Sequence, residues 1–360
     1  TLAGYAFPVG TRSITWTVID AASNTSTCTF NVIIIDDQPP TLDCPPTIDT
    51  ECASNLSPPY ATYADFVTAG GLAADNNGIN ASSFTLVNAV ISNQTCPNRY
   101  TITRTYRITD LSGNPAQCDQ TINVNDQSGP AITGTINPIT IEGCTVAAAP
   151  AAVTTVTGLE GLGLSIIDAC TADAAIVVTS ADAFDGSCPI IFTRTYTVTD
   201  ECGNFSTYNQ IINIDDGTPP SITGSIPETT VEGCSATAAP ARVTTVAALE
   251  DLGLAINDAC TSDADLVVTS TDASEGSCPI RVTRTYTVTD ACGNASTYNQ
   301  IINVSDRTAP TITGTIPVST AIGCLDSDLP TAATTVAALE ALGLAINDAC
   351  TSNDNLSVSH

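Results

Sequence analysis

The chain has 360 residues, 43% of them hydrophobic, which is long enough for about two to four folded domains and is not typical of a disordered chain. Only 13% of the residues are charged, but 37 acids against 9 bases, all arginine, give a net charge of -28. Nucleic acid is excluded as a partner because binding it requires a basic surface, and the absence of lysine excludes Schiff-base and P-loop chemistry.

Other features argue against a membrane span and a catalytic site. The longest apolar run, Val32 to Ile35, is far shorter than the roughly 18 residues that span a bilayer. The opening TLAGYAFPVGT has no basic region and is not predicted to be a signal peptide. The only histidine is His360, and no nucleophile with a base, or pair of catalytic carboxylates, stands out. We therefore predict a soluble, non-catalytic segment that begins and ends within domains.

One phrase recurs with a period of 90 residues. Its markers are Asn24, Asn114, Asn204 and Asn294, and Asp36, Asp126, Asp216 and Asp306. A period this long equals a small domain rather than a solenoid unit. The predicted divisions are a first repeat at 1–37, a second at 38–126, a third at 127–216, a fourth at 217–306 and a fifth at 307–360. Proline-rich phrases at the divisions, such as DDGTPP at 215–220, predict short, stiff joints and an extended rod.

The pattern inside a repeat favours β structure. Residues 192–200 alternate, with Phe192, Arg194, Tyr196 and Val198 on one face and threonines on the other, as in a half-buried strand. The turn DECGN and a second strand at 210–214 follow. In the next repeat, residues 243–254 contain good helix formers followed by a glycine, which predicts one short helix. The expected fold is all-β, with tandem immunoglobulin-like sandwiches of about 90 residues.

Fifteen cysteines, no CxxC motif and a single histidine indicate disulfides rather than zinc, which would need clustered ligands at short spacings. Disulfides in turn predict an extracytoplasmic protein.

Comparison of the repeats suggests which cysteines pair. Cysteines that persist or disappear together within a repeat are taken as partners: the second repeat has Gly78 and Ser112 where the third has Cys170 and Cys202. The predicted pairs are Cys44 with Cys118, Cys52 with Cys96, Cys144 with Cys188, Cys170 with Cys202, Cys234 with Cys278, and Cys260 with Cys292. Cys28, Cys324 and Cys350 are left over, with partners expected outside the sequence.

Two sets of motifs carry a family resemblance. FPVGTRSITWTVIDAASNTSTCTFNV in the first repeat resembles the end of a hyalin repeat (HYR) domain, although Ser23 replaces the usual glycine. RTYTVTDECGN and TVAALEALGLAINDAC resemble the HYR-like repeats of very large surface proteins of gliding and related bacteria. The resemblance implies an extracellular, immunoglobulin-like, adhesive segment on a bacterial cell surface, similar to gliding-motility adhesins exported by type 9 secretion.

The strongest candidate binding residues are acidic. Four aspartates open a D-x-x-[GS]-N turn and four stand at the joints: Asp20, Asp110, Asp200 and Asp290, and Asp36, Asp126, Asp216 and Asp306. With nearby carbonyl groups they form a hypothetical Ca²⁺ site at each joint. The alternative is an ordinary Asx turn and a strand-ending aspartate, which the lack of dense alternating carboxylates favours. A second acidic cluster contains Asp258, Asp263 and Asp265.

Arg104, Arg194 and Arg284 recur on the tyrosine-bearing face, where an unpaired charge would be costly. We expect each to form a structural ion pair, with Glu142 and Glu232 as candidate partners. The threonine face is expected to be ordinary strand surface rather than an ice-binding or glycan-bearing array.

The sequence therefore predicts a stalk or filament segment of an extracellular adhesin. Surface glycans, other surface proteins and lateral copies of the chain are the candidate partners. The alternative is a set of spacers or carbohydrate-binding modules in a secreted hydrolase, which Trp16 as the sole tryptophan disfavours.

Overall fold

The computed structural model describes residues 6–320, 322–323, 325, 327 and 330–359. The chain divides into two compact units. One contains residues 1–138, 151–183 and 193–211, and the other contains residues 139–150, 184–192 and 212–360. The division falls within the third repeat, whose long strands run from one unit into the other.

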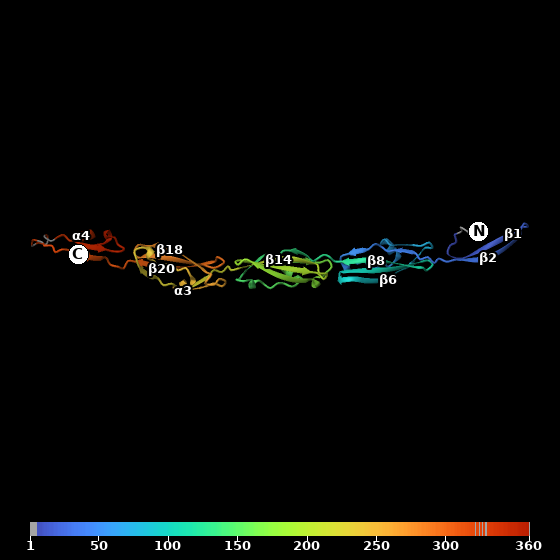
Figure 1. Ribbon diagram of the computed structural model, residues 1–360, viewed down its shortest axis with the longest axis horizontal. Coiled ribbons are helices and arrows are strands. Elements are labelled where there is room, and N and C mark those ends of the chain that lie inside the picture. Colours follow the sequence, from blue (N-terminus) through green and yellow to red (C-terminus); the bar gives the residue numbers. More distant parts are fainter. Residues whose placement is uncertain (1–5, 321, 324, 326, 328–329, 360) are drawn as a thin grey trace. The chain divides into compact units, whose positions relative to one another are not determined.

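The first unit begins with a hairpin and then a sheet pair. The hairpin joins β1 (Gly10–Ile19) to β2 (Thr25–Ile34). In the second repeat, a four-stranded sheet has the order β4-β8-β7-β6 and a two-stranded sheet joins β3 to β5. Figure 1 labels β6 and β8 of the larger sheet. The elements of this repeat are β3 (Thr41–Asp43), β4 (Ile48–Thr50), η1 (Ala53–Asn55), α1 (Tyr63–Thr68), β5 (Leu72–Ala74), β6 (Ile79–Cys96), β7 (Arg99–Asp110) and β8 (Pro115–Asn125).

The third repeat has the same arrangement of strands. Its sheets have the orders β10-β14-β13-β12 and β11-β9. The elements are β9 (Ala131–Gly134), β10 (Ile139–Glu142), η2 (Val146–Ala148), α2 (Val156–Gly161), β11 (Leu164–Ile167), η3 (Asp173–Ala175), β12 (Val177–Asp185), β13 (Ile190–Thr199) and β14 (Phe205–Asp215).

The second unit continues the pattern. The fourth repeat has sheets β16-β20-β19-β18 and β15-β17, and the fifth has the pair β21-β22. The elements are β15 (Ser221–Gly224), β16 (Thr229–Glu232), η4 (Ala236–Ala238), α3 (Val246–Asp251), β17 (Leu254–Asn257), β18 (Val267–Glu275), β19 (Ile280–Thr289), β20 (Ala295–Ser305), β21 (Thr311–Gly314), α4 (Val336–Ala341), β22 (Leu344–Asn347) and η6 (Asn353–Asn355). The expected all-β class, with tandem sheet pairs and one short helix in each later repeat, is confirmed.

The strand alternation read from the sequence is present in β13. Phe192, Arg194, Tyr196 and Val198 are buried, and the intervening threonines are half-buried. The strand therefore presents one full face to the core. The parallel pairing of β10 with β14 and of β16 with β20 joins a short edge strand to the long hairpin.

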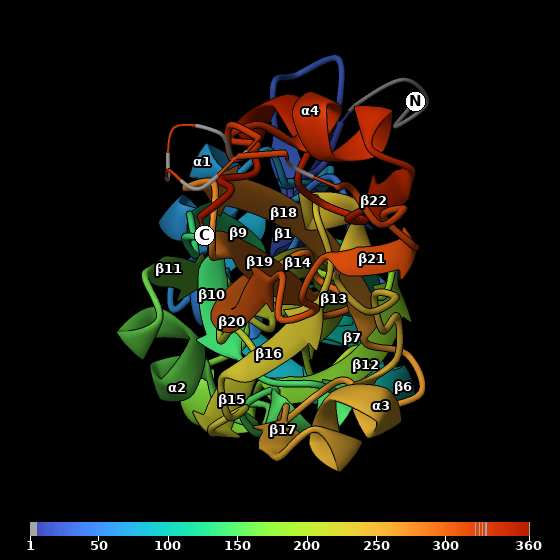
Figure 2. The same ribbon diagram turned by 90° about the vertical axis from the view of Figure 1, so that its left-hand side faces the viewer.

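The expected helix at 243–254 is shorter in the structure. Helix α3 begins after Thr245, whose side chain accepts a hydrogen bond from the Ala248 N–H, as an N-cap does. It ends before Gly253, which has a positive φ of 110°. Helices α2, α3 and α4 each lie beside the short strand that follows, as Figure 2 shows for α2 with β11 and α3 with β17.

Each complete repeat has an apolar core. In the fourth repeat, the buried residues of α3, β17, β18 and β19 form one cluster, and the buried residues of β19 and β20 form another. Among the described residues, one tyrosine in each complete repeat is fully buried, namely Tyr106, Tyr196 and Tyr286, and the second repeat also buries Phe66 fully. Among the described residues, no helix is long and apolar enough to cross a membrane.

Candidate functional site

The disulfides connect neighbouring repeats. One bond, Cys44–Cys118, lies within the second repeat, as the sequence comparison suggested. The other five join cysteines in consecutive repeats: Cys52–Cys170, Cys96–Cys202, Cys144–Cys260, Cys188–Cys292 and Cys234–Cys350. Their Cα atoms are 4.9 to 5.3 Å apart, within the ordinary range for a disulfide.

The structure therefore contradicts five of the predicted pairs. It does not form Cys52–Cys96, Cys144–Cys188, Cys170–Cys202, Cys234–Cys278 or Cys260–Cys292. Cys350 is bonded rather than left over, and Cys28 and Cys278 have no disulfide partner among the described residues. Cys324 lies outside the described residues.

The predicted pairs do not form because the cysteines of the third repeat lie at its two ends, where each bonds across a joint to a neighbouring repeat. Cys144 and Cys188 face the following repeat, whereas Cys170 and Cys202 face the preceding one. The loss of two cysteines together therefore has a different explanation. The second repeat has Gly78 and Ser112 in place of cysteines, and the first repeat has Ala6 at the position equivalent to Cys96. A cysteine disappears together with its partner across the joint.

The D-x-x-[GS]-N turn also contacts the preceding repeat. At the joint of the third and fourth repeats, the Asn294 side-chain amide donates to the main-chain oxygen of Asp216 at 2.7 Å and to the carboxylate of Asp290 at 2.8 Å. Asn204 contacts the Asp126 oxygen at 3.3 Å in the same way, and Asn114 contacts the Asp36 oxygen at 3.0 Å. The turn is thus an Asx turn, as the alternative interpretation expected, and it also forms part of the joint.

The expected acidic residues meet in new combinations. One carboxylate oxygen from each of Asp216, Asp258 and Asp290 lies within 4.8 Å of the other two. Asp36, Asp75 and Asp110 form an equivalent group one joint earlier. The joint aspartate therefore meets the turn aspartate of the next repeat, 74 residues away, and not the one 16 residues before it.

The joint between the second and third repeats differs. Asp126 lies with Asp168 and the disulfide-bonded Cys170. Burial raises the pKa of Asp126, and the Asp200 and Asp168 carboxylates raise it further, although the Ser128 N–H opposes this. Arg99 reaches this joint, where its guanidinium donates to the Asp126 main-chain oxygen at 2.6 Å and to Asn204 Oδ1 at 3.2 Å. The third and fourth repeats have Pro189 and Pro279 at the position of Arg99. This joint therefore already contains a positive charge.

Two of the joint aspartates are buried with an unsatisfied oxygen. Asp216 is 3% exposed and Asp126 is fully buried, and the Oδ2 atom of each lacks a hydrogen-bond partner among the described residues. Burial raises the pKa of Asp216, and the carboxylates of Asp258, Asp290 and Glu142 raise it further, although the Thr218 N–H opposes this. The carboxylate at this joint thus lacks the compensation that a buried charge requires.

The remaining expected acidic residues are not in such groups. Asp20 accepts hydrogen bonds from the N–H groups of Ala22 and Asn24, and Asp306 accepts one from Thr308. In the second acidic cluster, Asp265 accepts from the Ser262 hydroxyl, and only Asp258 belongs to one of the carboxylate groups found among the described residues.

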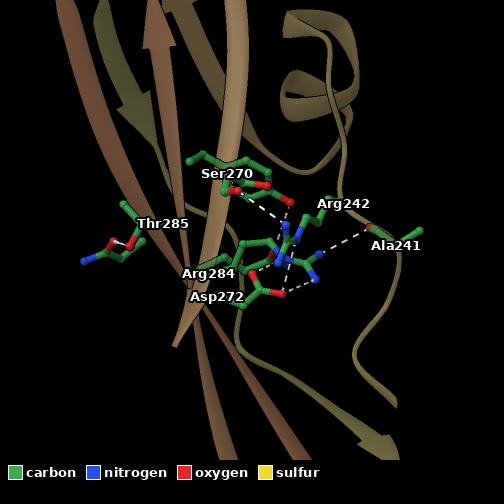
Figure 3. Close-up of polar contacts among 9 residues, drawn as sticks. Ala241, Arg242, Ser270, Asp272, Arg284 and Thr285 are labelled. Atoms are coloured by element: carbon green, nitrogen blue, oxygen red, sulfur yellow. Dashed lines mark hydrogen bonds and ion pairs between the residues drawn. The ribbon is translucent and has the colours of Figure 1, made fainter. Parts of the chain in front are cut away.

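Two of the three core arginines, Arg194 and Arg284, form ion pairs with partners on the adjacent strand. Arg284 on β19 is 3% exposed, and its Nε lies 2.9 Å from Asp272 Oδ1 on β18 (Figure 3). Its Nη1 donates to the Ala241 oxygen at 3.2 Å. Arg194 pairs with Asp182 at 2.8 Å in the same way, whereas Arg104 donates to the Ser57 main-chain oxygen at 2.7 Å.

The candidate partners Glu142 and Glu232 were therefore wrong. Each glutamate instead accepts hydrogen bonds at a joint. Glu142 accepts from the Gly217 N–H and the Thr218 hydroxyl, and Glu232 accepts from the Arg307 N–H and the Thr308 hydroxyl, at 3.1 to 3.3 Å. The glutamates end the short strands β10 and β16, which places them beside the proline-rich connectors.

Two family models match parts of the chain. Residues 1–34 match the model described as "HYR domain", and residues 236–304 match the model described as "HYR-like domain with 4 cysteines". Both matches support a relationship between this chain and the HYR repeat family. In the third repeat, all four cysteines bond across joints, two to the preceding repeat and two to the following one.

The chain is similar to a curated protein named hyalin from Lytechinus variegatus. The two are 31% identical over 238 residues, which is 61% of this chain and 40% of hyalin. The chain therefore spans less than half of the relative that it matches.

The comparison with solved structures matched cadherin ectodomains at low TM-score and low identity. The protocadherin gammaB4 extracellular domain has a TM-score of 0.29 and 13% identity, with 86% of this chain and 57% of that chain covered. Human desmocollin-1 has a TM-score of 0.23 and 11% identity, and covers 86% and 69%. Drosophila N-cadherin EC1–4 has a TM-score of 0.25 and 10% identity, and covers 84% and 85%.

Proposed function

We propose that residues 1–360 are a structural and adhesive stretch of HYR repeats in a large extracellular protein, and that this stretch is non-catalytic. The observation that supports this proposal most directly is the series of cross-repeat disulfides. Among the described residues, five of the six bonds join consecutive repeats. Two disulfides cross the joint between the second and third repeats, two cross the joint between the third and fourth, and one crosses the joint between the fourth and fifth.

This covalent arrangement suits a protein that transmits force. A repeat that began to unfold under tension would remain bonded to both neighbours, so the chain could not lengthen freely at that point. In the chain-entropy model, a disulfide that closes a loop of about 100 residues stabilises the folded state by about 4 to 5 kcal/mol. Disulfides also require an oxidising compartment, which supports an extracellular location.

The acidic surface bears on how such chains would associate. A net charge of -28 keeps neighbouring chains soluble and mutually repelling. We therefore propose that lateral self-association, or attachment to surface glycans or other surface proteins, depends on cations or on a dedicated binding domain.

A narrower proposal is supported by the repeat motifs alone. RTYTVTDECGN and TVAALEALGLAINDAC resemble repeats of giant bacterial surface adhesins. We propose on this basis that the protein is a surface adhesin or filament stalk of a gliding or surface-attached bacterium, exported by type 9 secretion.

Immunogold labelling of intact, unpermeabilised cells with an antibody against residues 127–306 tests this function. We expect labelled fibres on the cell surface, and no label on cells that lack the gene. Label on a soluble species in the medium, with none on cells, would instead support the stalk of a secreted hydrolase and overturn the adhesin proposal.

A further inference from the structure

The joint of the third and fourth repeats contains a compact group of oxygen donors. Asp216 ends the third repeat, while Asp258 follows β17 and Asp290 follows β19 in the fourth. One oxygen of each carboxylate lies within 4.8 Å of the other two. Three negative charges at such separations repel one another strongly unless a cation or protons compensate them.

Local hydrogen bonds fix the position of two of these carboxylates. Asp290 accepts from the N–H groups of Cys292 and Asn294, at 2.9 and 2.8 Å, and Asp258 accepts from those of Cys260 and Thr261, at 2.9 and 2.7 Å. These contacts orient both groups without neutralising their charge. None of the ion pairs found among the described residues involves any of the three aspartates.

An independent observation points to a missing ligand. Asp216 is 3% exposed, and its Oδ2 atom has no hydrogen-bond partner in the described part of the chain, although its Oδ1 accepts from the Thr218 N–H at 3.2 Å. A buried carboxylate oxygen without a donor is costly and unusual in a folded protein. The same Oδ2 atom is unsatisfied in Asp126, one joint earlier.

We propose that Asp216, Asp258 and Asp290 bind a hard divalent cation, and that calcium is the ion that this donor set fits. The set contains only carboxylate oxygens, which calcium prefers in proteins, and calcium tolerates a less regular arrangement of ligands than magnesium does. Bound there, the ion would link the last residue of one repeat to two turns of the next. This proposal rests on the joint geometry and not on the adhesive role.

The other joints give the proposal internal comparisons. Asp36, Asp75 and Asp110 form an equivalent group, so a second site is expected there. At the intermediate joint, the Arg99 guanidinium contacts the Asp126 main-chain oxygen, and a disulfide sulfur stands in place of a third close carboxylate. We expect that joint to bind calcium more weakly.

Calorimetric titration of the full chain with calcium chloride, after dialysis against EDTA, tests the site. We expect the native chain to bind calcium, with a rise in melting temperature of about 3 °C or more. Asp216→Asn and Asp258→Asn should each remove one bound ion per chain or weaken its binding at least about tenfold, since each removes a full charge from the site.

Asp263→Asn is the matched control. Asp263 is an exposed aspartate of the same loop and belongs to none of the carboxylate groups in the described residues, so its substitution should leave calcium binding unchanged. If Asp216→Asn prevents folding, as judged by circular dichroism, Asp258→Asn decides. The proposal is overturned if the native chain has the same melting temperature in EDTA and in about 5 mM calcium. It is also overturned if Asp258→Asn binds as much calcium, as tightly, as the native chain.

Discussion

At the scale of single residues, the buried ion pairs show which charges the fold depends on. Arg284 is 3% exposed and keeps its charge in the core through Asp272 and the Ala241 oxygen. The Asp272 carboxylate has a lowered pKa, chiefly because Arg284 donates hydrogen bonds to it. Sequence reasoning found that the arginine needed a partner, but it could not identify the aspartate, because the choice depends on cross-strand register.

Asp272→Ala should destabilise the fourth repeat by about 3 kcal/mol, since it leaves Arg284 as a buried charge without its carboxylate. Hydrogen exchange of the β19 amides in the full chain measures this loss. Arg281→Ala is the control, because Arg281, which is also on β19, pairs with Glu275 of β18 in solvent, and its loss should cost less than about 1 kcal/mol. Equal losses for the two variants would contradict the buried-pair interpretation.

The same pair predicts a dependence on pH. Because the pKa of Asp272 is lower in the folded state than in the unfolded state, its contribution to stability is present above the unfolded value of about 4 and is lost as the pH falls through the folded value. The difference in melting temperature between the native chain and Asp272→Asn should therefore be largest near neutral pH and shrink in acid. A difference that grew as the pH fell would contradict this sign.

At the scale of elements, local patterns predicted more than pairing did. The alternation in 192–200 predicted β13, because successive side chains of a strand point to opposite faces and only one face is fully buried. The helix was predicted over 243–254, but it begins only after the Thr245 N-cap and ends at Asp251. The prediction was too long because the pattern continues on both sides of these bounds. The parallel pairing of β10 with β14 joins residues more than 70 positions apart, and no local pattern encodes it.

The pairing of β9 with β11 depends on a glycine that no other residue can replace. Gly134 has a φ of 88°, and a Cβ atom there would collide with the Gly163 oxygen. Gly134→Ala should therefore weaken the β9–β11 pair by about 2 kcal/mol or more, measured by exchange of the Ile166 amide. Gly161→Ala, at the open end of α2, should be neutral or stabilise by up to about 1 kcal/mol. A milder effect at Gly134 than at Gly161 would contradict this explanation.

At the scale of the whole molecule, the sequence predicted the repeat period but not the disulfides that connect one repeat to the next. The comparison of repeats correctly recognised that cysteines vary in pairs, yet it compared positions within each repeat. The structure pairs Cys144 with Cys260 and Cys188 with Cys292, so the correct comparison is between one repeat and the next. A repeating sequence does not distinguish the two pairings, because every repeat supplies equivalent cysteines. Bonds within repeats and bonds between repeats therefore give the same pattern of cysteine positions.

Cleavage of the main chain at a joint distinguishes the two pairings. A specific protease site inserted after Thr218 would separate residues 1–218 from 219–360. Because Cys144–Cys260 and Cys188–Cys292 cross this point, the two pieces should migrate together on a denaturing gel without reductant and separate when reductant is added.

A variant with alanine at Cys144, Cys188, Cys260 and Cys292 provides the control, and its pieces should separate without reductant. If the pieces of the native chain also separated without reductant, Cys144–Cys188 and Cys260–Cys292 would be the true bonds. Neighbouring repeats would then be joined only by the main chain and by contacts such as Asn294 with Asp216. Retention of the pieces would mean that disulfides as well as the main chain join the third repeat to the fourth, so that tension can pass this joint through either connection.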